Sequence, residues 1–338
     1  MIKEVAKDIY TFNVDMPQTA LKQLNIFVIK TPERNVIFDT GYNLPETKEQ
    51  LLAGIAELGL EVGDLDLVIT HLHADHSGLA YLFQEAGCRI YAGEVDGEII
   101  NRMVSDQYWE TISERQAAYT GQMETMDLSV NPGYAFKSNE TIDFIPLKIG
   151  ETFNVGQYQF EVMDLIGHTP GHIGLYEPNY QFIFSADTVL DPISPNITYW
   201  GEEYPNILND YLKTLEHLKP LNLKRMFATH RQLIDRPNRR IDEIISHHHE
   251  RLQEILDAMS EGMSYTVEDI SRQISWRVKF DKWENFPKSQ KFFATGETMA
   301  HLDYLVHSGH VLCEIINGVY HFQKVEATIQ NIYKNVIV

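Results

Sequence analysis

The chain has 338 residues, which is enough to bury a large core and longer than a typical single domain, so its length predicts two domains. It carries 28 basic and 48 acidic residues, and a surface with a net charge of −20 repels the phosphate backbone of a nucleic acid. Only short basic runs occur, such as residues 236–240. We therefore expect a small-molecule substrate, and the charge argues against nucleic acid as a partner.

The cysteines and the N-terminal residues point to a reducing compartment. Cys88 and Cys313 are far apart and form neither a disulfide framework nor a Cys-x-x-Cys metal motif. The first residues lack the charged and apolar regions of a secretion signal, and no apolar run approaches the 18 residues that a membrane span needs. We expect a cytoplasmic protein that does not cross a membrane.

The first 45 residues predict strands at 9–12, 25–29 and 35–41. Pro32 suits the hairpin turn between the last two of these strands. The third strand ends in Asp39, followed by Thr40 and Gly41. Taken alone, an aspartate at such a place more often caps a turn than serves a function.

A helix is predicted at 47–58, and a buried strand at 67–70 ends abruptly in a cluster of histidines and an aspartate. Side chains at i and i+2 of an extended chain project to the same side, so His71 and His73 can bind one cation together. Asp75 and His76 fall in the following turn, where they can face a second cation.

A helix after Ser77 and a strand at 89–92 complete a β-α-β-α rhythm, which predicts an α/β fold. Residues 94–135 are predicted as a helical insertion rich in aromatic and methionine side chains. Packing on the core or on a partner subunit is favoured over a substrate lid, although the two roles are compatible. A homodimer formed through this insertion is therefore compatible with the sequence.

Strands return at 144–147, 158–162, 182–184 and 225–229, and more candidate ligands stand near their ends. His168 opens the run His-Thr-Pro-Gly-His, Asp187 follows the strand at 182–184, and His230 follows the strand at 225–229. His172, at the end of the same run, is interpreted as a structural residue of the turn. Residues 247–249 are three consecutive histidines in a predicted helix, where neighbours point in different directions, so they make a poor metal site.

The His-x-His-x-Asp-His pattern at 71–76, followed in order by His168, Asp187 and His230, resembles the metallo-β-lactamase-fold hydrolases over about residues 5–235. The resemblance implies an αββα sandwich as a catalytic domain at residues 1–236, with the insertion at 94–135. It also implies two divalent metal ions and a supporting role for Asp39 next to the ligands. By the same resemblance, metal one would be held by His71, His73 and His168, metal two by Asp75, His76 and His230, and Asp187 would bridge them.

Imidazole and carboxylate ligands favour zinc, with manganese or iron as alternatives. The chain departs from its relatives at Arg231, where a glycine often follows the last histidine. Arg231 can contact an anionic substrate, but a solvent-facing arginine is the commoner case.

The C-terminal part, residues 237–338, predicts helices at 241–259, from Thr266 and at 297–306, followed by a hairpin at 311–322 that turns at Asn317-Gly318. This order resembles the winged-helix appendix of some metallo-β-lactamase-fold hydrolases. The helix at 297–306 carries Glu297 and Asp303 but no lysine or arginine. A packing or dimerising module is therefore favoured over DNA binding.

Two adjacent cations can generate hydroxide from a shared water near neutral pH. The leading hypothesis is that this hydroxide attacks an ester, thioester or lactone carbonyl, with Asp75 orienting it or passing on its proton. The loop at 187–197 resembles that of glyoxalase-II-like hydrolases, whereas Leu190 stands where quorum-quenching lactonases usually have tyrosine. A phosphodiesterase or ribonuclease using the same centre is the alternative enzyme, and a metal-containing DNA-binding regulator is the alternative without catalysis.

Overall fold

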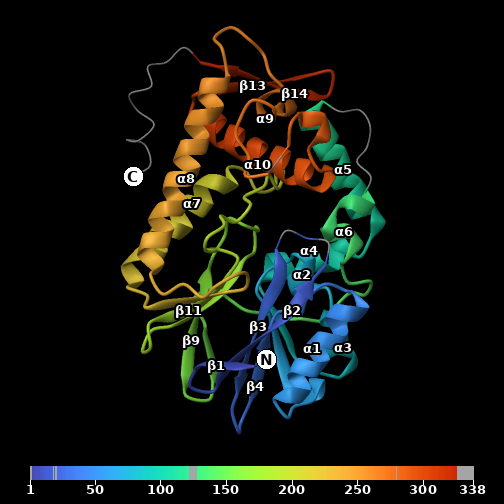
Figure 1. Ribbon diagram of the computed structural model, residues 1–338, viewed down its shortest axis with the longest axis vertical. Coiled ribbons are helices and arrows are strands. Elements are labelled where there is room, and N and C mark those ends of the chain that lie inside the picture. Colours follow the sequence, from blue (N-terminus) through green and yellow to red (C-terminus); the bar gives the residue numbers. More distant parts are fainter. Residues whose placement is uncertain (1, 18, 20, 122–127, 279, 326–338) are drawn as a thin grey trace.

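The computed structural model describes residues 2–17, 19, 21–121, 128–278 and 280–325. Two β-sheets form the lower half of the molecule in Figure 1, and the C-terminal helices α8 and α10 stand at one end of them. The α/β class predicted from the sequence is confirmed, because both sheets are accompanied by helices along the chain.

The first sheet has its strands side by side in chain order, and the early ones pair antiparallel up to β4. From β4 onwards the neighbours pair parallel. Parallel strands leave a sheet at the same edge, so Asp39 after β4 and His71 after β5 emerge next to each other. The strands are β1 (Lys3–Ala6), β2 (Ile9–Met16), β3 (Lys22–Lys30), β4 (Asn35–Phe38), β5 (Leu65–Ile69), β6 (Ile90–Ala92) and β7 (Ile145–Pro146).

The second sheet has the order β12-β11-β10-β9-β8, and its last two strands in the chain, β11 and β12, pair parallel. Asp187 after β11 and His230 after β12 therefore also emerge at one edge. The sequence analysis did not predict β10, in which all five residues are buried and no polar alternation marks a strand. The strands are β8 (Thr152–Val155), β9 (Tyr158–Asp164), β10 (Ile173–Glu177), β11 (Phe182–Ala186) and β12 (Arg225–Ala228).

Aromatic side chains fill the space between the two sheets. Phe38 of β4 stacks on Phe184 of β11 with ring centroids 4.1 Å apart, and Phe227 of β12 lies 4.9 Å from Phe184. Burying one such side chain stabilises the fold by about 1.5–3 kcal/mol. This packing fixes the two sheets against each other just below the edges where the candidate ligands emerge.

Helices lie between the strands and form much of the C-terminal part. The sequence analysis did not predict α7, although its apolar residues recur at helical spacing, and it predicted only the second half of α10. Residues 122–127 of the predicted insertion lie outside the described part. The helices are α1 (Pro45–Glu57), α2 (Ala74–Ser77), α3 (Ala80–Glu85), α4 (Glu94–Met103), α5 (Asp106–Thr120), α6 (Pro132–Ala135), α7 (Ile207–Leu218), α8 (Pro237–Ala258), α9 (Val267–Ser271) and α10 (Lys288–His307).

The C-terminal part consists of α8, α9, α10 and the hairpin of β13 (Val311–Ile316) and β14 (Val319–Lys324), which turns at the predicted Asn317-Gly318. Its description as a winged-helix domain and the boundary at residue 236 stay predictions. Among the described residues, none of the helices combines the length and the apolar character that crossing a bilayer requires.

Candidate metal centre

The seven predicted ligands meet at one end of the two sheets. His71 and His73 follow β5, His168 lies in the turn between β9 and β10, and the remaining ligands follow β11 and β12 or lie in α2. The structure places Asp75 and His76 in the one-turn helix α2, where the sequence predicts a plain turn. Three groups could each hold a metal ion, because their ligand atoms lie within 4.8 Å of one another: His71, His73 and His168; His71, His76 and Asp187; and Asp75, His76 and His230.

Asp187 stands between the histidines of the different groups. Its Oδ2 lies 3.7 Å from Nε2 of His168, 3.7 Å from Nε2 of His76 and 3.4 Å from Nε2 of His230. Thr229, which precedes His230, donates a hydrogen bond to the other oxygen, Oδ1. One carboxylate oxygen therefore faces ring nitrogens from both sides of the centre, while the second oxygen is held by the protein.

The Nδ1 atoms of the histidines are engaged by protein groups. Nδ1 of His168 lies 2.8 Å from the carbonyl oxygen of Asn196, and Nδ1 of His230 lies 3.0 Å from the carbonyl oxygen of Gln23. A carbonyl oxygen only accepts, so each Nδ1 carries a hydrogen, and in the neutral imidazole that a metal ion requires each Nε2 keeps its lone pair. Nε2 of His71 and of His168 is buried and has no hydrogen-bond partner within the described residues. Inward lone pairs without a partner fit the donor set that a divalent metal ion requires.

Asp39 is linked by hydrogen bonds to two of the histidines, directly to His76 and through Thr70 to His71. Nδ1 of His76 donates to Oδ2 of Asp39 over 2.8 Å, and the hydroxyl of Thr70 donates to the same carboxylate. That hydroxyl oxygen lies 3.1 Å from Nδ1 of His71, from which it can accept a hydrogen bond. All four side chains are buried. One carboxylate thus orients both imidazoles, directly for His76 and through Thr70 for His71.

Asp96 on α4 ties two ligand-bearing turns together, and the sequence analysis missed it. Its carboxylate accepts from the backbone N–H of Leu72 at 2.9 Å, from that of Gly171 at 2.6 Å, and from the hydroxyl of Thr169. Burial raises the pKa of Asp96 to about 6, while these three donors oppose the rise. A Cβ on Gly171 would lie 2.4 Å from the Asp96 nitrogen, so only glycine lets α4 approach this closely. The residues lie far apart in sequence, and no local pattern reveals the contact.

The electrostatics of the two histidine groups differ. Burial lowers the pKa of His71 well below its usual value and that of His73 to about 3, so both imidazoles are neutral and ready to act as ligands. Burial likewise acts to lower the pKa of His230, but the Asp187 and Asp75 carboxylates raise it to about 10. The group that contains the carboxylates therefore attracts positive charge strongly.

Three residues around the centre adopt left-handed backbone conformations that side-chain-bearing residues rarely take. Asp39 has φ 62°, Ala186 directly before Asp187 has φ 42°, and Arg231 directly after His230 has φ 66°. Such a conformation costs about 1–3 kcal/mol and persists where the surroundings determine it. At Arg231, this is a backbone conformation that glycine would adopt without strain.

Two aromatic side chains form part of the wall around the ligands. Trp200 lies with its ring centroid 6.1 Å from that of His73, and its indole Nε1 has no partner within the described residues. Burial, with the nearby Asp75 and Asp187 carboxylates, raises the pKa of Tyr42 well above its usual value. His172 stacks on His71 with ring centroids 4.7 Å apart and is absent from the three ligand groups.

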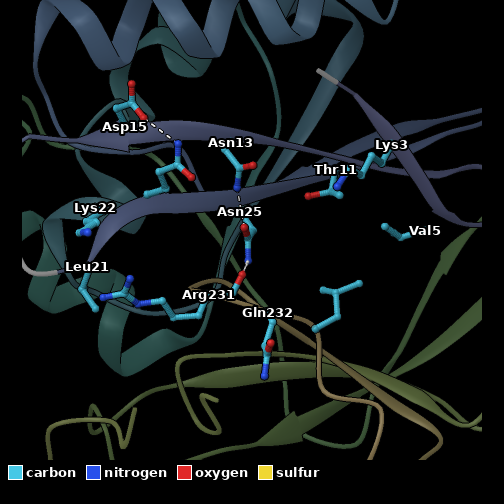
Figure 2. A pocket seen from close by; sticks show the side chains of 12 residues that line it. Lys3, Val5, Thr11, Asn13, Asp15, Leu21, Lys22, Asn25, Arg231 and Gln232 are labelled. Atoms are coloured by element: carbon cyan, nitrogen blue, oxygen red, sulfur yellow. Dashed lines mark hydrogen bonds between the residues drawn. The ribbon is translucent and has the colours of Figure 1, made fainter. Parts of the chain in front are cut away.

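A cavity of about 560 Å³ lies between the β2–β3 strands and the residues after His230. Figure 2 shows the side chains that line it. Asn25 spans this region, because its side chain accepts from Asn13 and donates to the carbonyl oxygen of Arg231. Lys22 and the Arg231 side chain lie at one end of the cavity (Figure 2). Gln23, another lining residue, contacts Nδ1 of His230, so the cavity lies on the Nδ1 side of that imidazole and the ligand groups lie on its Nε2 side.

Comparisons with known proteins match this chain to a protein family and to two named hydrolases. The family model described as the metallo-beta-lactamase superfamily matches residues 20–230, more than half of the chain. Acyl-coenzyme A thioesterase MBLAC2 of Bos taurus is 28% identical over 203 residues, which are 57% of this chain and 66% of the relative, just under two thirds of its length. Hydroxyacylglutathione hydrolase GloC of Haemophilus influenzae is 30% identical over 177 residues, which are 52% of this chain and 70% of the relative.

A solved structure extends the likeness beyond the family match. The crystal structure of a metallo-beta-lactamase family protein from Thermus thermophilus has a TM-score of 0.81 and 25% identity, and the alignment covers 95% of this chain and 100% of that chain. The shared architecture therefore includes the C-terminal helices as well as the two sheets.

Proposed function

This chain belongs to the metallo-β-lactamase superfamily of hydrolases, and we propose that it hydrolyses an acyl thioester, with esters and lactones as the related alternatives. The observation that carries the proposal is the pair of ligand groups on either side of Asp187. The thioester is placed first because one relative is named an acyl-coenzyme A thioesterase and another a hydroxyacylglutathione hydrolase.

The site would hold two divalent metal ions, zinc in the first place and manganese or iron as alternatives. When bound, such ions supply a Lewis acid for the scissile carbonyl and lower the pKa of water at the site. We propose one ion in the histidine group and one in the carboxylate-containing group, with Asp187 shared. The proposed ligands are His71, His73 and His168 for the first ion, and Asp75, His76 and His230 for the second.

Asp75 is the proposed proton acceptor. Its Oδ2 lies 3.2 Å from Nε2 of His230 and 3.5 Å from Nε2 of His76, at the inner side of the centre. Burial acts to raise the pKa of Asp75, but the neighbouring histidines lower it, so the carboxylate is ionised at neutral pH, which is the form that a proton acceptor needs. Asp39 and the carbonyl oxygens of Asn196 and Gln23 hold the imidazoles in place while this happens.

Trp200 would exclude water from one side of the substrate. Its indole ring lies next to that of His73. Arg115 donates a hydrogen bond to the backbone carbonyl oxygen of Trp200 and so holds the backbone there. A buried indole N–H without a partner costs free energy unless a ligand satisfies it. We propose that the acyl part of the substrate packs against this ring.

The experiment is a substrate panel on protein loaded with zinc. The panel contains an acyl-coenzyme A, a hydroxyacylglutathione, an acyl homoserine lactone, an aryl ester and the phosphodiester bis(p-nitrophenyl) phosphate. We expect turnover of a thioester, lost on chelation and reduced at least ~100-fold in Asp75→Ala and Asp187→Ala. Asp257→Ala, which removes an exposed carboxylate of α8 bonded to Gln253, is the matched control. Turnover of the phosphodiester alone, or full activity in both variants, would refute the proposal.

A further inference from the structure

The C-terminal helix α10 is connected to the candidate metal centre through Asn196. Asn196 lies in the loop between β11 and α7, and its backbone carbonyl oxygen accepts from Nδ1 of His168 over 2.8 Å. The position of this carbonyl oxygen therefore sets the direction in which Nε2 of His168 points. Whatever holds Asn196 in place also orients a proposed metal ligand.

Asn196 is held by its own side chain. Its Nδ2 donates to Oε2 of Glu297 at 3.0 Å and to the carbonyl oxygen of Phe293 at 3.3 Å, and both acceptors belong to α10. The Glu297 side chain is only 12% exposed. An amide group with both hydrogens bonded to one rigid helix has little freedom, and this restraint passes to the backbone of the same residue.

The carboxylate of Glu297 has its own support. Nε of Arg251 on α8 lies 3.6 Å from Oε1 of Glu297, and the Arg251 side chain is 8% exposed. Arg251 in turn donates to Glu254 and to the carbonyl oxygen of Ser275, and its guanidinium lies 4.5 Å from the Trp276 ring centroid. The arginine compensates the buried charge, so a carboxylate can be kept at this position.

The loop and the helix also touch through their backbones. The N–H of Tyr199 donates to the carbonyl oxygen of Gly296 over 3.2 Å. A Cβ on Gly296 would lie 2.2 Å from Oγ1 of Thr198, so glycine is needed for this approach. The loop therefore cannot shift without moving α10, which lies across this end of the molecule in Figure 1.

We propose that Glu297 is a positioning residue of the metal centre, acting through Asn196 on His168, so that the C-terminal helices complete the hydrolytic site. The inference rests on the proposed function in that His168 is taken as a metal ligand. It assigns the C-terminal part a role in metal binding. The alternative is that Glu297 merely stabilises the packing of α10, and the two roles give different results when metal binding and folding are measured separately.

The test compares Glu297→Ala, Glu297→Gln and Asp303→Ala. Asp303 is the matched control, because it is also a carboxylate of α10 and accepts from the backbone N–H of Asn206 at the far end of the same loop. Each purified full-length protein is stripped with a chelator, and its affinities for Zn²⁺ and Co²⁺ are measured by competition with a chromophoric chelator. Thermal unfolding of the metal-free proteins reports folding, and the visible spectrum of the Co²⁺ form reports ligand geometry.

We expect Glu297→Ala to bind the ion proposed at His71, His73 and His168 about 10–100-fold less tightly and to change the Co²⁺ spectrum. Glu297→Gln retains an acceptor for Asn196 and should restore the affinity to within about threefold, while Asp303→Ala should match the wild type. A loss in Glu297→Ala no larger than that in Asp303→Ala, or a glutamine variant as weak as the alanine variant, would overturn the inference.

A second variant covers the case in which Glu297→Ala does not fold. Asn196→Ala keeps the carbonyl oxygen but removes the side chain that α10 holds, so it should show the same loss of affinity, and normal affinity would overturn the inference. Wild-type hydrolysis separates the two proposals. A wild type that binds zinc but hydrolyses nothing in the panel refutes the proposed function and leaves the positioning role testable, whereas an active wild type with unchanged affinity in Asn196→Ala refutes only the positioning role.

Discussion

The Asp39 carboxylate lies 2.8 Å from Nδ1 of His76, in a contact where neither side chain is exposed. Asp39 also accepts from both the N–H and the hydroxyl of Thr70, so every neighbour that it contacts in these bonds is a donor. If a group that donates a hydrogen bond replaced this carboxylate, at least one of the three hydrogen bonds would be lost.

Asp39→Asn is therefore expected to weaken zinc binding about 10–100-fold and to destabilise the protein by about 1–3 kcal/mol, because its NH₂ group would face a donor. Zinc competition and urea unfolding measure the two effects. Asp257→Asn, at an exposed carboxylate of α8 that accepts from Gln253, is the control and should change neither. Wild-type zinc affinity in Asp39→Asn would contradict the orienting role.

Asp96→Asn should destabilise the protein by about 1–3 kcal/mol, since the carboxylate accepts three hydrogen bonds and an amide would leave a buried donor unpaired. The same change should loosen the turns that carry His73 and His168. Urea unfolding and hydrogen exchange at Leu72 and Gly171 measure these effects. Asp106→Asn serves as the control, because Asp106 is bonded to Tyr134 at an exposed site. Unchanged hydrogen exchange at both amides would show that Asp96 does not hold these two turns in place.

Removal of metal should lower the thermal stability. Burial acts to raise the pKa values of Asp75 and Asp187, but His76 and His230 hold both below their usual range, so the carboxylates stay ionised. Without metal, only protonated histidines compensate these two charges within the described part of the chain. A ligand at about 1,000 times its dissociation constant stabilises the folded state by about 4 kcal/mol. Scanning calorimetry before and after chelation should show a fall in Tm that zinc reverses, with a smaller shift in Asp187→Ala. An identical Tm with and without zinc would argue against a bound ion.

A buried histidine pair should make the C-terminal helices sensitive to acid. His301 donates from Nδ1 to the carbonyl oxygen of Glu297, and its Nε2 lies 3.1 Å from Nδ1 of His248. Burial lowers the pKa of His301 to about 3, against about 6.5 in the unfolded chain. Below pH 6.5 the unfolded state binds the extra proton, so this stabilising contribution is complete above that pH and is lost as pH falls towards 3.

One such group can lower the free energy of unfolding by at most about 1.4 kcal/mol for each pH unit. In His301→Gln the urea midpoint should fall less steeply between about pH 6.5 and 4.5 than in the wild type. His307→Gln is the matched control, because His307 lies on the same helix and bonds to the carbonyl oxygen of Asp303 in the same way, but is exposed. Equal slopes in all three proteins would show that His301 does not titrate as described.

The sequence predicted most strands because their apolar runs are bounded by clear turns, and it predicted the ligand residues because histidines and aspartates stand where those runs stop. It missed α7 although Leu208, Leu212 and Leu215 follow helical spacing, so this signal was available. It missed β10 because the strand is buried on both faces and is interrupted by Gly174. Where the whole of a strand is buried, alternation disappears and with it the local evidence.

The contacts that orient the ligands were beyond the reach of the sequence. Asp39 contacts His76 from another strand, Asp96 ties its two turns from α4, and Glu297 reaches Asn196 from a helix 101 residues away in the chain. No pattern in the sequence links such a buried carboxylate to its partners, because the packing of separate elements brings them together. Residue types at strand ends were enough to identify the family and to propose the ligands in their order along the chain, and the resemblance added a supporting role for Asp39. Which histidine Asp39 contacts, that Asp96 and Glu297 act beside it, and how the C-terminal helices reach the site depend on long-range packing, because only the folded chain brings these groups within hydrogen-bond distance.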